Sequence, residues 1–433
     1  MIKIPLGKIE QCATKVGPRI KDYLKKQWEP VHVKNVLRCF VRKLEDYEIF
    51  IQDLADKEIL TLVDNRDYFV AEYIILCEWI DNNGFKLSPK KGSDPKEFKY
   101  SLAKGNSAEK LYYKFLKELH HHSKLTETPF FDLKEVTTSI KNIRAELKKA
   151  KVSEDKFKEF FDRIFRNFRE INVLLSKTNN YKYYSKIIRN DLVKELDIQV
   201  CPYCNSTLII SDSDFNEADF ITVYDTEYNT ANLDHFFPKA IFPLFALSLG
   251  NFVPSCSKCN SNFKKEKYID LVNPRYESFD PDAGFYIKSI TPSVYYDYKK
   301  SELEILFNIS DCAQKKKIKH SYELFRIRDH LEHEQVKKQA CEIFWKIRST
   351  TEDAYKNYIK DYQSANGDID EIEKEIREFL QFKVQQNKLK DIDCDYSLDG
   401  DRSHVINVEY GKLKFDIIDQ YLGVGTRFLP ISS

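Results

Sequence analysis

Two Cys-x-x-Cys pairs constrain the folding of this chain more than any other feature of its sequence. They are Cys201-Pro-Tyr-Cys204 and Cys256-Ser-Lys-Cys259. Each pair can present two thiolates to one tetrahedral ion from a tight turn, and two such pairs complete a closed four-cysteine zinc site. A single pair could equally be a redox motif, but two pairs in one segment favour zinc. The sequence therefore predicts a structural Zn²⁺ bound by Cys201, Cys204, Cys256 and Cys259.

The segment between the pairs is much longer than the roughly 15–20 residues that separate them in a common zinc ribbon. It contains the dipeptide Asp234-His235. A histidine beside a carboxylate can act as a general base next to a metal ligand. Elsewhere such a dipeptide is usually a solvated pair or a hydrogen-bonded core histidine. Its position between two zinc-binding turns favours the functional interpretation.

The stretch from about residue 196 to 280 resembles the HNH endonucleases, the ββα-metal class. In that family a strand ends in Asp-His, a loop carries an Asn, and a helix carries the final His or Asn, often between two clamping Cys-x-x-Cys pairs. The resemblance implies that His235 is the general base that activates water and that Asp234 is a ligand of the catalytic ion. It also implies that Asn251 holds the loop and orients the base. Asn260 would complete an H-N-N motif and help to bind the catalytic ion, Mg²⁺ or Mn²⁺.

Two longer sequence stretches are similar to HNH nucleases of bacterial antiphage systems. They are Asp-His-Phe-Phe-Pro-Lys from Asp234 and Cys-Asn-Ser-Asn-Phe-Lys from Cys259. The Septu and retron-associated nucleases, which work with an ABC-type ATPase, are of this kind. The resemblance implies an endonuclease of nucleic acid, DNA in the first place, that acts with a protein partner such as an ATPase. Two alternatives stay open. One is a restriction or homing nuclease that acts alone, and the other is a non-catalytic, zinc-stabilised binding module.

Five basic residues begin within the second cysteine pair and continue behind it. We predict that they contact phosphates, which position a nucleic acid without distinguishing its sequence, although a solvated helix face would have the same composition. The chain has 69 basic and 68 acidic residues and a net charge of +1. This balance excludes a global positive field that attracts nucleic acid, so binding must come from a local patch or a partner. The five residues are Lys258, Lys264, Lys265, Lys267 and Arg275.

The flanking sequence predicts a mainly α protein with a small α+β core. With 433 residues, of which 42% are hydrophobic, the chain is long enough for two or three domains with sizeable cores. We expect a helical region over 1–195 that docks a partner and a treble-clef-like ββα-metal nuclease domain over 196–285. A helical region with short strands over 286–433 would support the nuclease domain or contact a partner or nucleic acid.

Apolar spacing and turn residues predict the individual elements. Helices are expected at Val33–Tyr47, Tyr68–Ile80, from Ala108, at Leu133–Ala150, Ser153–Leu175, Ser185–Leu196, at Asp311–Arg348 and at Ile369–Leu389, with a short helix or turn at Pro243–Leu249. The resemblance to the ββα-metal class implies a further helix from Ser257. Strands are expected at Thr207–Ser211, Phe220–Tyr224, Phe285–Ile290, Val294–Tyr298 and Leu303–Asn308. The segments Val405–Tyr410 and Leu413–Ile418 around Gly411-Lys412 predict a β-hairpin.

The remaining cysteines are scattered through the sequence, mostly in apolar patterns. Since no signal peptide precedes them, we expect reduced thiols of a cytoplasmic protein. No apolar run approaches the ~20 residues that span a membrane, so we expect no membrane association. These cysteines are Cys12, Cys39, Cys77, Cys312, Cys341 and Cys394.

Overall fold

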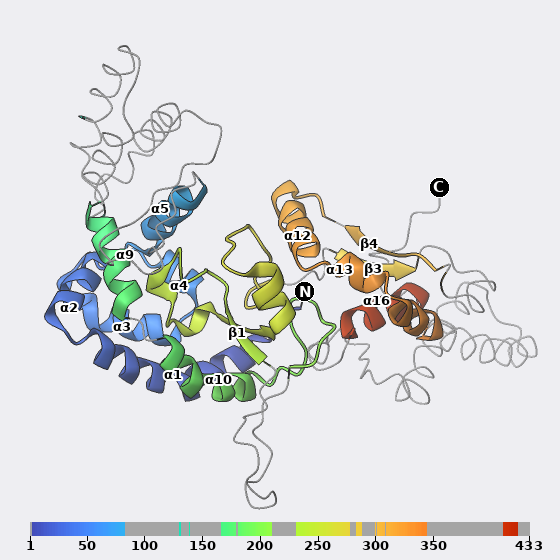
Figure 1. Ribbon diagram of the computed structural model, residues 1–433, viewed down its shortest axis with the longest axis horizontal. Helices are drawn as coiled ribbons and strands as arrows, with labels where there is room; N and C mark the ends of the chain where they lie inside the picture. Colours follow the sequence, from blue (N-terminus) through green and yellow to red (C-terminus); the bar gives the residue numbers. More distant parts are fainter. Residues whose placement is uncertain are drawn as a thin grey trace, which may run out of the picture.

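The structure of this chain is a computed structural model. The part that it describes is mainly helical, with two antiparallel sheets of two strands each. In Figure 1 the N-terminal helices, the first sheet and the C-terminal elements follow one another along the longest axis. Within the described residues, no helix is both long and apolar enough to cross a membrane. These residues are 2–82, 130, 138, 166–178, 181–209, 231–277, 283–287, 299, 301–307, 309–343 and 410–422.

Helix α1 (Leu6–Trp28) joins the N-terminal helices to the segment that leads into the first cysteine pair. It packs against both α3 (Tyr47–Asp56) and α10 (Tyr181–Leu196). Its buried residues recur at every third or fourth position, which places them on one face of the helix. They are Ile9, Cys12, Val16, Gly17, Ile20, Leu24 and Trp28.

The predicted continuous helix over 33–47 is wrong in its second half. Helix α2 (Val31–Leu37) ends early, and two 3₁₀ turns precede α3. Between these turns Val41 is extended and pairs with Tyr68. Because this pairing with a distant segment supplies other hydrogen-bond partners, the helical ladder stops there. The two turns are η1 (Arg38–Phe40) and η2 (Leu44–Asp46).

The other N-terminal helices agree with their apolar patterns. The predicted buried helix over 68–80 is confirmed as α5, in which Tyr73, Leu76 and Cys77 are buried. α10 begins before the predicted Ser185, and α9 continues past the predicted Leu175. The helices predicted from Ala108, at 133–150 and at 369–389 lie outside the described residues, as does the start of the helix predicted at 153–175. The bounds are Ile59–Asp64 (α4), Val70–Asn82 (α5) and Arg166–Thr178 (α9).

Two strands and a short helix form a unit around the predicted site. β1 (Ala231–His235) and β2 (Phe252–Cys256) are antiparallel, and the helix η6 (Lys258–Lys264) follows β2 directly and contacts both strands. We call β1, β2 and η6 the ββα unit. η6 is a π-helix, a rare form that is frequent at functional sites. The helix predicted from Ser257 and the turn predicted over 243–249 are therefore present, the turn as η4 (Pro243–Phe245) and η5 (Leu249–Asn251).

A second sheet follows the ββα unit in the sequence. β3 (Ala283–Ile287) and β4 (Leu303–Phe307) are antiparallel, which confirms two predicted strands. The strand predicted at 207–211 is represented, among the described residues, by an isolated bridge between Val200 and Leu208. The strands predicted at 220–224 and 294–298 lie outside the described residues.

The single helix predicted over 311–348 is wrong. Asp311 caps the N-terminus of α12 (Cys312–Leu324), because its carboxylate accepts a hydrogen bond from the Ala313 N–H at 2.8 Å. The helix then ends, since Arg326 adopts a left-handed conformation with φ of 52°. A new helix, α13 (Ile327–Leu331), starts beyond it.

The β-hairpin predicted around Gly411-Lys412 is also wrong, because residues 411–422 form helix α16 (Gly411–Leu422). The alternation of apolar residues that suggested strands has another cause, since α16 packs on β3 and is buried around much of its circumference. Two of its charged residues, Lys412 and Asp416, form a buried ion pair one turn apart at 3.0 Å. Asp416 also accepts a hydrogen bond from the Phe285 N–H in β3.

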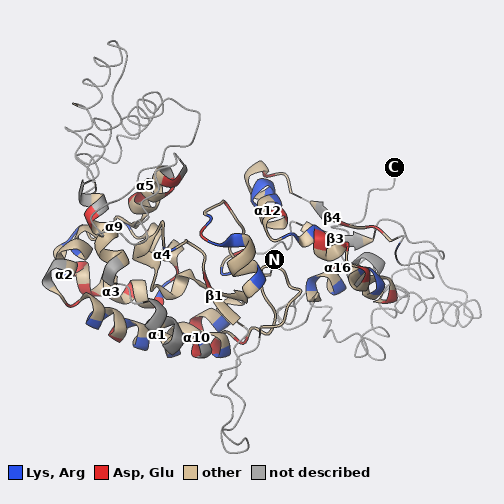
Figure 2. Ribbon diagram, viewed as in Figure 1, with Lys and Arg blue, Asp and Glu red and all other residues tan. Residues whose placement is uncertain are grey.

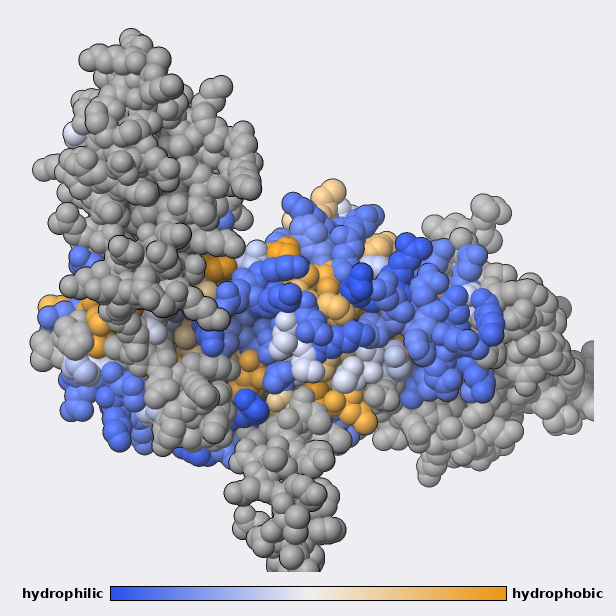
Figure 3. Space-filling view, viewed as in Figure 1, coloured by the Kyte–Doolittle hydropathy of each residue, from blue (hydrophilic) through white to orange (hydrophobic). Residues whose placement is uncertain are grey.

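The described hydrophobic core is one cluster that runs from the N-terminal helices through the ββα unit to the C-terminal sheet. On the surface visible in Figure 3, the coloured atoms are mainly hydrophilic, and apolar residues lie in small separate patches. The ββα unit therefore shares one core with the helices that precede it in the sequence and with the elements that follow it.

Candidate metal centre and catalytic pocket

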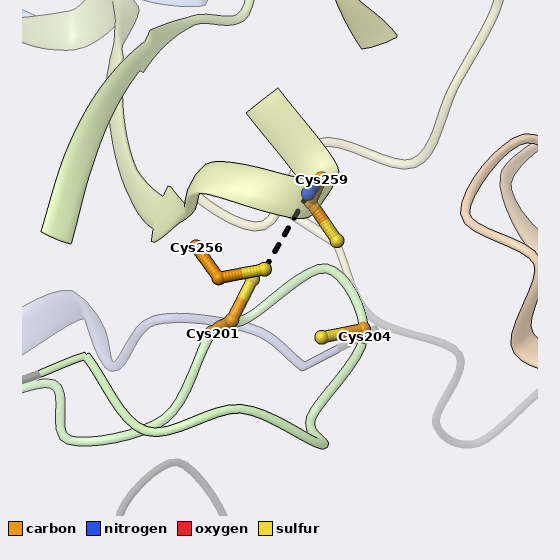
Figure 4. Close-up of side chains that lie close together, drawn as sticks. All are labelled: Cys201, Cys204, Cys256 and Cys259. Atoms are coloured by element: carbon orange, nitrogen blue, oxygen red, sulfur yellow. Dashed lines mark hydrogen bonds between the residues drawn. The ribbon is translucent and has the colours of Figure 1, made fainter. Parts of the chain in front are cut away.

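The four cysteines of the two Cys-x-x-Cys pairs meet at one point. Cys201 and Cys204 come from the loop after α10, Cys256 ends β2, and Cys259 lies on η6. All four residues are buried, and their Sγ atoms lie within 4.8 Å of one another. Figure 4 shows the four sulfurs converging. Four thiolates around one Zn²⁺ with Zn–S bonds of 2.3 Å would lie about 3.8 Å apart, so the cluster fits a structural zinc ion.

Local backbone geometry prepares the two cysteine turns. Asn205 closes the first turn in the left-handed conformation, with φ of 52°, and its N–H donates to the Cys201 carbonyl at 2.8 Å. In the second turn the Cys259 N–H donates to Cys256 Sγ at 3.4 Å. Such bonds stabilise negative charge on sulfur. Asparagine tolerates a positive φ better than most residues, which explains why it follows the first pair.

The sulfur atoms also influence one another's ionisation. Hydrogen bonding with Cys201 is the largest cause that lowers the pKa values of Cys204 and Cys256. Burial raises the pKa of Cys201. Cys204 and Cys256 therefore ionise to thiolates more readily than ordinary cysteines, although both are buried. A divalent cation would compensate their charge and favour ionisation of the other two.

His235 stands at the end of β1 with its ring buried, at 8% exposure. Its Nε2 lies 3.0 Å from the Ala246 carbonyl oxygen. A carbonyl oxygen only accepts, so Nε2 carries the proton and Nδ1 of the neutral ring carries the basic lone pair. Burial is the main cause that lowers the pKa of His235 to about 3; the bond to Ala246 opposes this shift, and the nearby charges of Lys239 and Lys264 add to it. The ring is therefore neutral at neutral pH, as a general base must be.

Asn251 holds the loop that connects β1 to β2. Its side chain is fully buried, and its Nδ2 donates to the carbonyl oxygens of Phe237 and Phe245, each at 3.0 Å. Its Oδ1 accepts from the Phe237 N–H at 2.7 Å. These bonds fix the loop on which Ala246 lies, and Ala246 in turn orients His235. The positioning role of Asn251 stays a prediction, and these contacts are the path by which it would act on His235.

Asp234 is held more firmly than a free metal ligand would be. It is 2% exposed and accepts a hydrogen bond from the Tyr203 hydroxyl at 2.5 Å. The Lys264 ammonium lies 3.1 Å from each carboxylate oxygen and also donates to the His235 carbonyl at 2.6 Å. Tyr203 belongs to the first cysteine turn, so this contact links the metal centre to Asp234. A catalytic ion at Asp234 would share its carboxylate with Lys264 or displace the ammonium.

One pocket is lined by three of the residues predicted for catalysis or its metal ion, but not by Asn251. A cavity of about 320 Å³ is lined by Asp234 and His235 from β1 and by Asn260 from η6. Asn260 is partly exposed there. Carboxylate and amide oxygens are hard donors that suit Mg²⁺ or Mn²⁺, so the donor set fits such an ion. The pocket is also lined by Arg189, Lys239, Lys265 and Glu266.

Two of the five predicted phosphate contacts are wrong. Lys264 is 1% exposed and pairs with Asp234. Arg275 is also 1% exposed; its guanidinium forms a salt bridge with Glu58 and donates to the Phe252 carbonyl at 2.9 Å. Both charges are therefore committed to buried partners and do not reach a nucleic acid.

The other three predicted phosphate contacts, Lys258, Lys265 and Lys267, are exposed. Figure 2 shows basic residues at the ends of the helix that follows β2, η6, and along α12. Acidic residues are interspersed elsewhere. The basic residues of α12 belong to the run Lys315, Lys316, Lys317 and Lys319, which the predicted set does not include. Phosphate binding by Lys258, Lys265 and Lys267 stays a prediction.

Sequence inspection missed three side chains that shape the site: Tyr203, Arg189 and Glu58. Tyr203 had a usable signal, since it lies inside the first cysteine pair. Arg189 had none, because α10 approaches the pocket only in the folded chain. Glu58 had none either, since its partner Arg275 lies far along the sequence. Comparison with protein-family models, curated proteins and solved structures gives no match.

Proposed function

We propose that this chain is a metal-dependent HNH endonuclease that hydrolyses phosphodiester bonds of nucleic acid, with DNA as the first candidate. One observation carries the proposal: Asp234, His235 and Asn260, which an HNH motif requires together, line one pocket. Asp234 and His235 lie on β1, which pairs with β2, and Asn260 lies on the helix η6 that follows β2, beside a four-cysteine cluster. The order of these elements is the one that the resemblance implies.

The residues divide the hydrolysis between them. In the proposed reaction a water molecule attacks the phosphorus, its proton passes to Nδ1 of His235, and the bond to the leaving oxygen breaks. That oxygen then takes a proton from solvent. Asn251 acts as a positioning residue through the loop that carries Ala246. A divalent ion held by Asp234 and Asn260 would neutralise charge on the phosphate and stabilise the leaving oxygen.

Substitution of the base tests this function. His235→Ala should reduce cleavage of plasmid, linear DNA or RNA by a factor of 10² or more, because general-base catalysis typically contributes 10²–10⁴. Purified protein would be assayed with Mg²⁺ or Mn²⁺, and zinc content would show that the variant is folded. The matched control is His333→Ala, which changes an exposed histidine just after α13 (Ile327–Leu331) and should retain full activity. An active His235→Ala enzyme would place the catalytic base elsewhere.

One observation favours the alternative, a zinc-stabilised binding module. Asp234 is fully engaged by Tyr203 and Lys264, an arrangement that also suits a purely structural carboxylate. The two functions differ in their metal content. The nuclease should bind Mn²⁺ in addition to structural zinc, and Asp234→Asn should weaken that binding in a calorimetric titration. A module should bind no Mn²⁺ in either form and should cleave nothing.

We further propose that the nuclease is an effector of a bacterial antiphage defence system and acts with a partner such as an ABC-type ATPase. The resemblance of its motif sequence to nucleases of antiphage systems supports this proposal. The net charge of +1 also supports it, because it gives the free chain little attraction for nucleic acid. Co-expression with proteins encoded beside it tests the idea. A partner should co-purify and change the rate or specificity of cleavage. A chain that cleaves at full rate alone, and whose neighbours do not bind it, would instead fit a stand-alone restriction or homing nuclease.

A further inference from the structure

Helix α10 brings a basic residue to the catalytic pocket from outside the ββα unit. α10 packs against β1, and its residue Arg189 lines the same cavity as Asp234, His235 and Asn260. Arg189 belongs to the helical region that precedes the first cysteine pair. The pocket wall is therefore shared between the ββα unit and the preceding helices.

The guanidinium of Arg189 is incompletely satisfied. Its Nε is buried and has no hydrogen-bond partner, and across the described residues no ion pair of Arg189 occurs. Buried polar groups are nearly always hydrogen-bonded, and an exception calls for an explanation. A buried N–H without a partner costs roughly 1–3 kcal/mol. A ligand that accepts a hydrogen bond from this N–H would remove that cost.

The surroundings select an anion as that missing partner. Lys239 and Lys265 line the cavity beside Arg189, and the neutral ring of His235 adds no negative charge. Glu266 and Asp234 are the acidic residues of the wall, and Asp234 is already paired with Lys264. A guanidinium presents its N–H groups as a planar fork that matches two oxygens of a phosphate. The chemistry of the wall therefore suits a phosphodiester.

We propose that Arg189 binds the non-bridging oxygens of a nucleic-acid phosphate in the catalytic pocket. This inference rests on the proposed function, because it makes the bound phosphate the substrate of His235. It assigns a substrate-binding residue to α10, beyond the motif of the ββα unit. The N-terminal helices then contribute directly to substrate binding.

Binding can be measured without cleavage. In a His235→Ala background, the affinity for the dinucleotide dTpdT would be determined by calorimetry at low salt. Arg189→Gln should weaken binding by about 10-fold or more, the range for a charge-assisted hydrogen bond. Arg189→Lys should lie between, since it keeps the charge and loses the fork. The matched control is Lys194→Gln, which removes one exposed charge from the same helix and should change affinity less than twofold.

A stability measurement separates binding from a structural role. Arg189→Met removes an unsatisfied buried group, so its melting temperature should equal or exceed that of the parent. Inorganic phosphate should raise the melting temperature of the parent and not that of Arg189→Met, because a ligand of the folded state stabilises it. A lower melting temperature of Arg189→Met without phosphate would show a structural arginine and overturn the inference.

The outcomes for Arg189 and for the nuclease are independent. If the enzyme cleaves nucleic acid and Arg189→Gln changes neither KM nor dTpdT affinity, the inference is wrong and the proposed function stands. If nothing is cleaved but phosphate and dTpdT binding depend on Arg189, the pocket binds phosphate and the proposed reaction is wrong.

Discussion

His235 shows how one residue's environment sets its chemistry. The ring is buried and lies near two ammonium groups, so its pKa falls to about 3 from an ordinary 6.5, although the hydrogen bond to Ala246 opposes this shift. A base with so low a pKa is always available at neutral pH but is weak. A bound phosphate beside the ring would raise that pKa, because a nearby negative charge favours the protonated form.

The lowered pKa predicts a pH dependence of stability. Between pH 6.5 and about 3 the unfolded chain binds a proton at His235 that the folded chain does not. The contribution of this group is therefore fully present above pH 6.5 and is lost as the pH falls through that window, at no more than about 1.4 kcal/mol per unit. His235→Gln should lack this loss. Urea unfolding at pH 7 and pH 5 should show a drop that is smaller by about 2 kcal/mol in His235→Gln than in the parent.

The control for this experiment is His333→Gln, because His333 is exposed. It should keep the full drop between pH 7 and pH 5. A His235→Gln protein with the same acid sensitivity as the parent would mean that the ring of His235 titrates normally in the folded chain.

At the scale of elements, the first cysteine turn is a junction of three segments. Tyr203 reaches Asp234 in β1 and stacks on Phe325, with ring centroids 4.4 Å apart. Asn205 accepts a hydrogen bond from the Tyr410 N–H at 2.6 Å through its carbonyl and another from the Lys412 N–H at 3.0 Å through its side chain. The second bond satisfies an N–H at the start of α16, as an N-cap does. The first cysteine turn thus contacts both β1 and a C-terminal helix.

Loss of zinc should therefore destabilise elements outside the ββα unit as well as those within it. Elemental analysis should find about one zinc per chain, and Cys204→Ser should lose zinc and destabilise the turn, since structural zinc contributes directly to folding. Hydrogen exchange should increase in β1 and also in α16. Cys312→Ser, which removes an exposed cysteine, should change neither zinc content nor exchange. Well-folded parent protein without zinc would contradict the assignment of the four cysteines.

At the scale of the whole molecule, the N-terminal region contacts the ββα unit and the segments beside it at several points. Glu58, which precedes α4, forms a salt bridge with Arg275, and Arg275 also donates to Phe252 in β2. Gly250 lies directly against this segment, since a Cβ there would come within 2.6 Å of the Lys57 carbonyl oxygen. The N–H of Ile2 donates to the Pro202 carbonyl at 3.0 Å, inside the first cysteine pair.

These contacts predict that the N-terminal region stabilises the site, whether or not it also docks a partner. Glu58→Ala would leave the Arg275 charge buried and unpaired, a change that typically costs 3–5 kcal/mol. Thermal or urea unfolding would measure this loss, and cleavage should fall with it because β2 loses an anchor. Glu48→Ala removes an exposed partner of Lys25 and should cost less than about 1 kcal/mol. Equal stability of the two variants would mean that Arg275 is satisfied without Glu58.

The sequence alone located the four-cysteine cluster, because its signals are local. Two cysteines three positions apart define a metal-binding turn, and the four cysteines do meet in space. The buried helix over 68–80 and the strands of the second sheet also follow from short-range apolar patterns. The helix after Cys256 was expected from the resemblance of the motif. Asp234, His235 and Asn260 were predicted from the resemblance to the HNH motif, and all three line one pocket.

Only the tertiary structure decided which charged side chains are available and which local patterns survive. Lys264 and Arg275 are buried because their partners, Asp234 and Glu58, come from other segments. Residues 411–422 form a helix because packing on β3 buries both their apolar residues and an internal ion pair. Arg189 reaches the pocket because α10 packs on β1. Burial and charge pairing depend on contacts between segments far apart in the chain, and spacing within one segment does not carry that information.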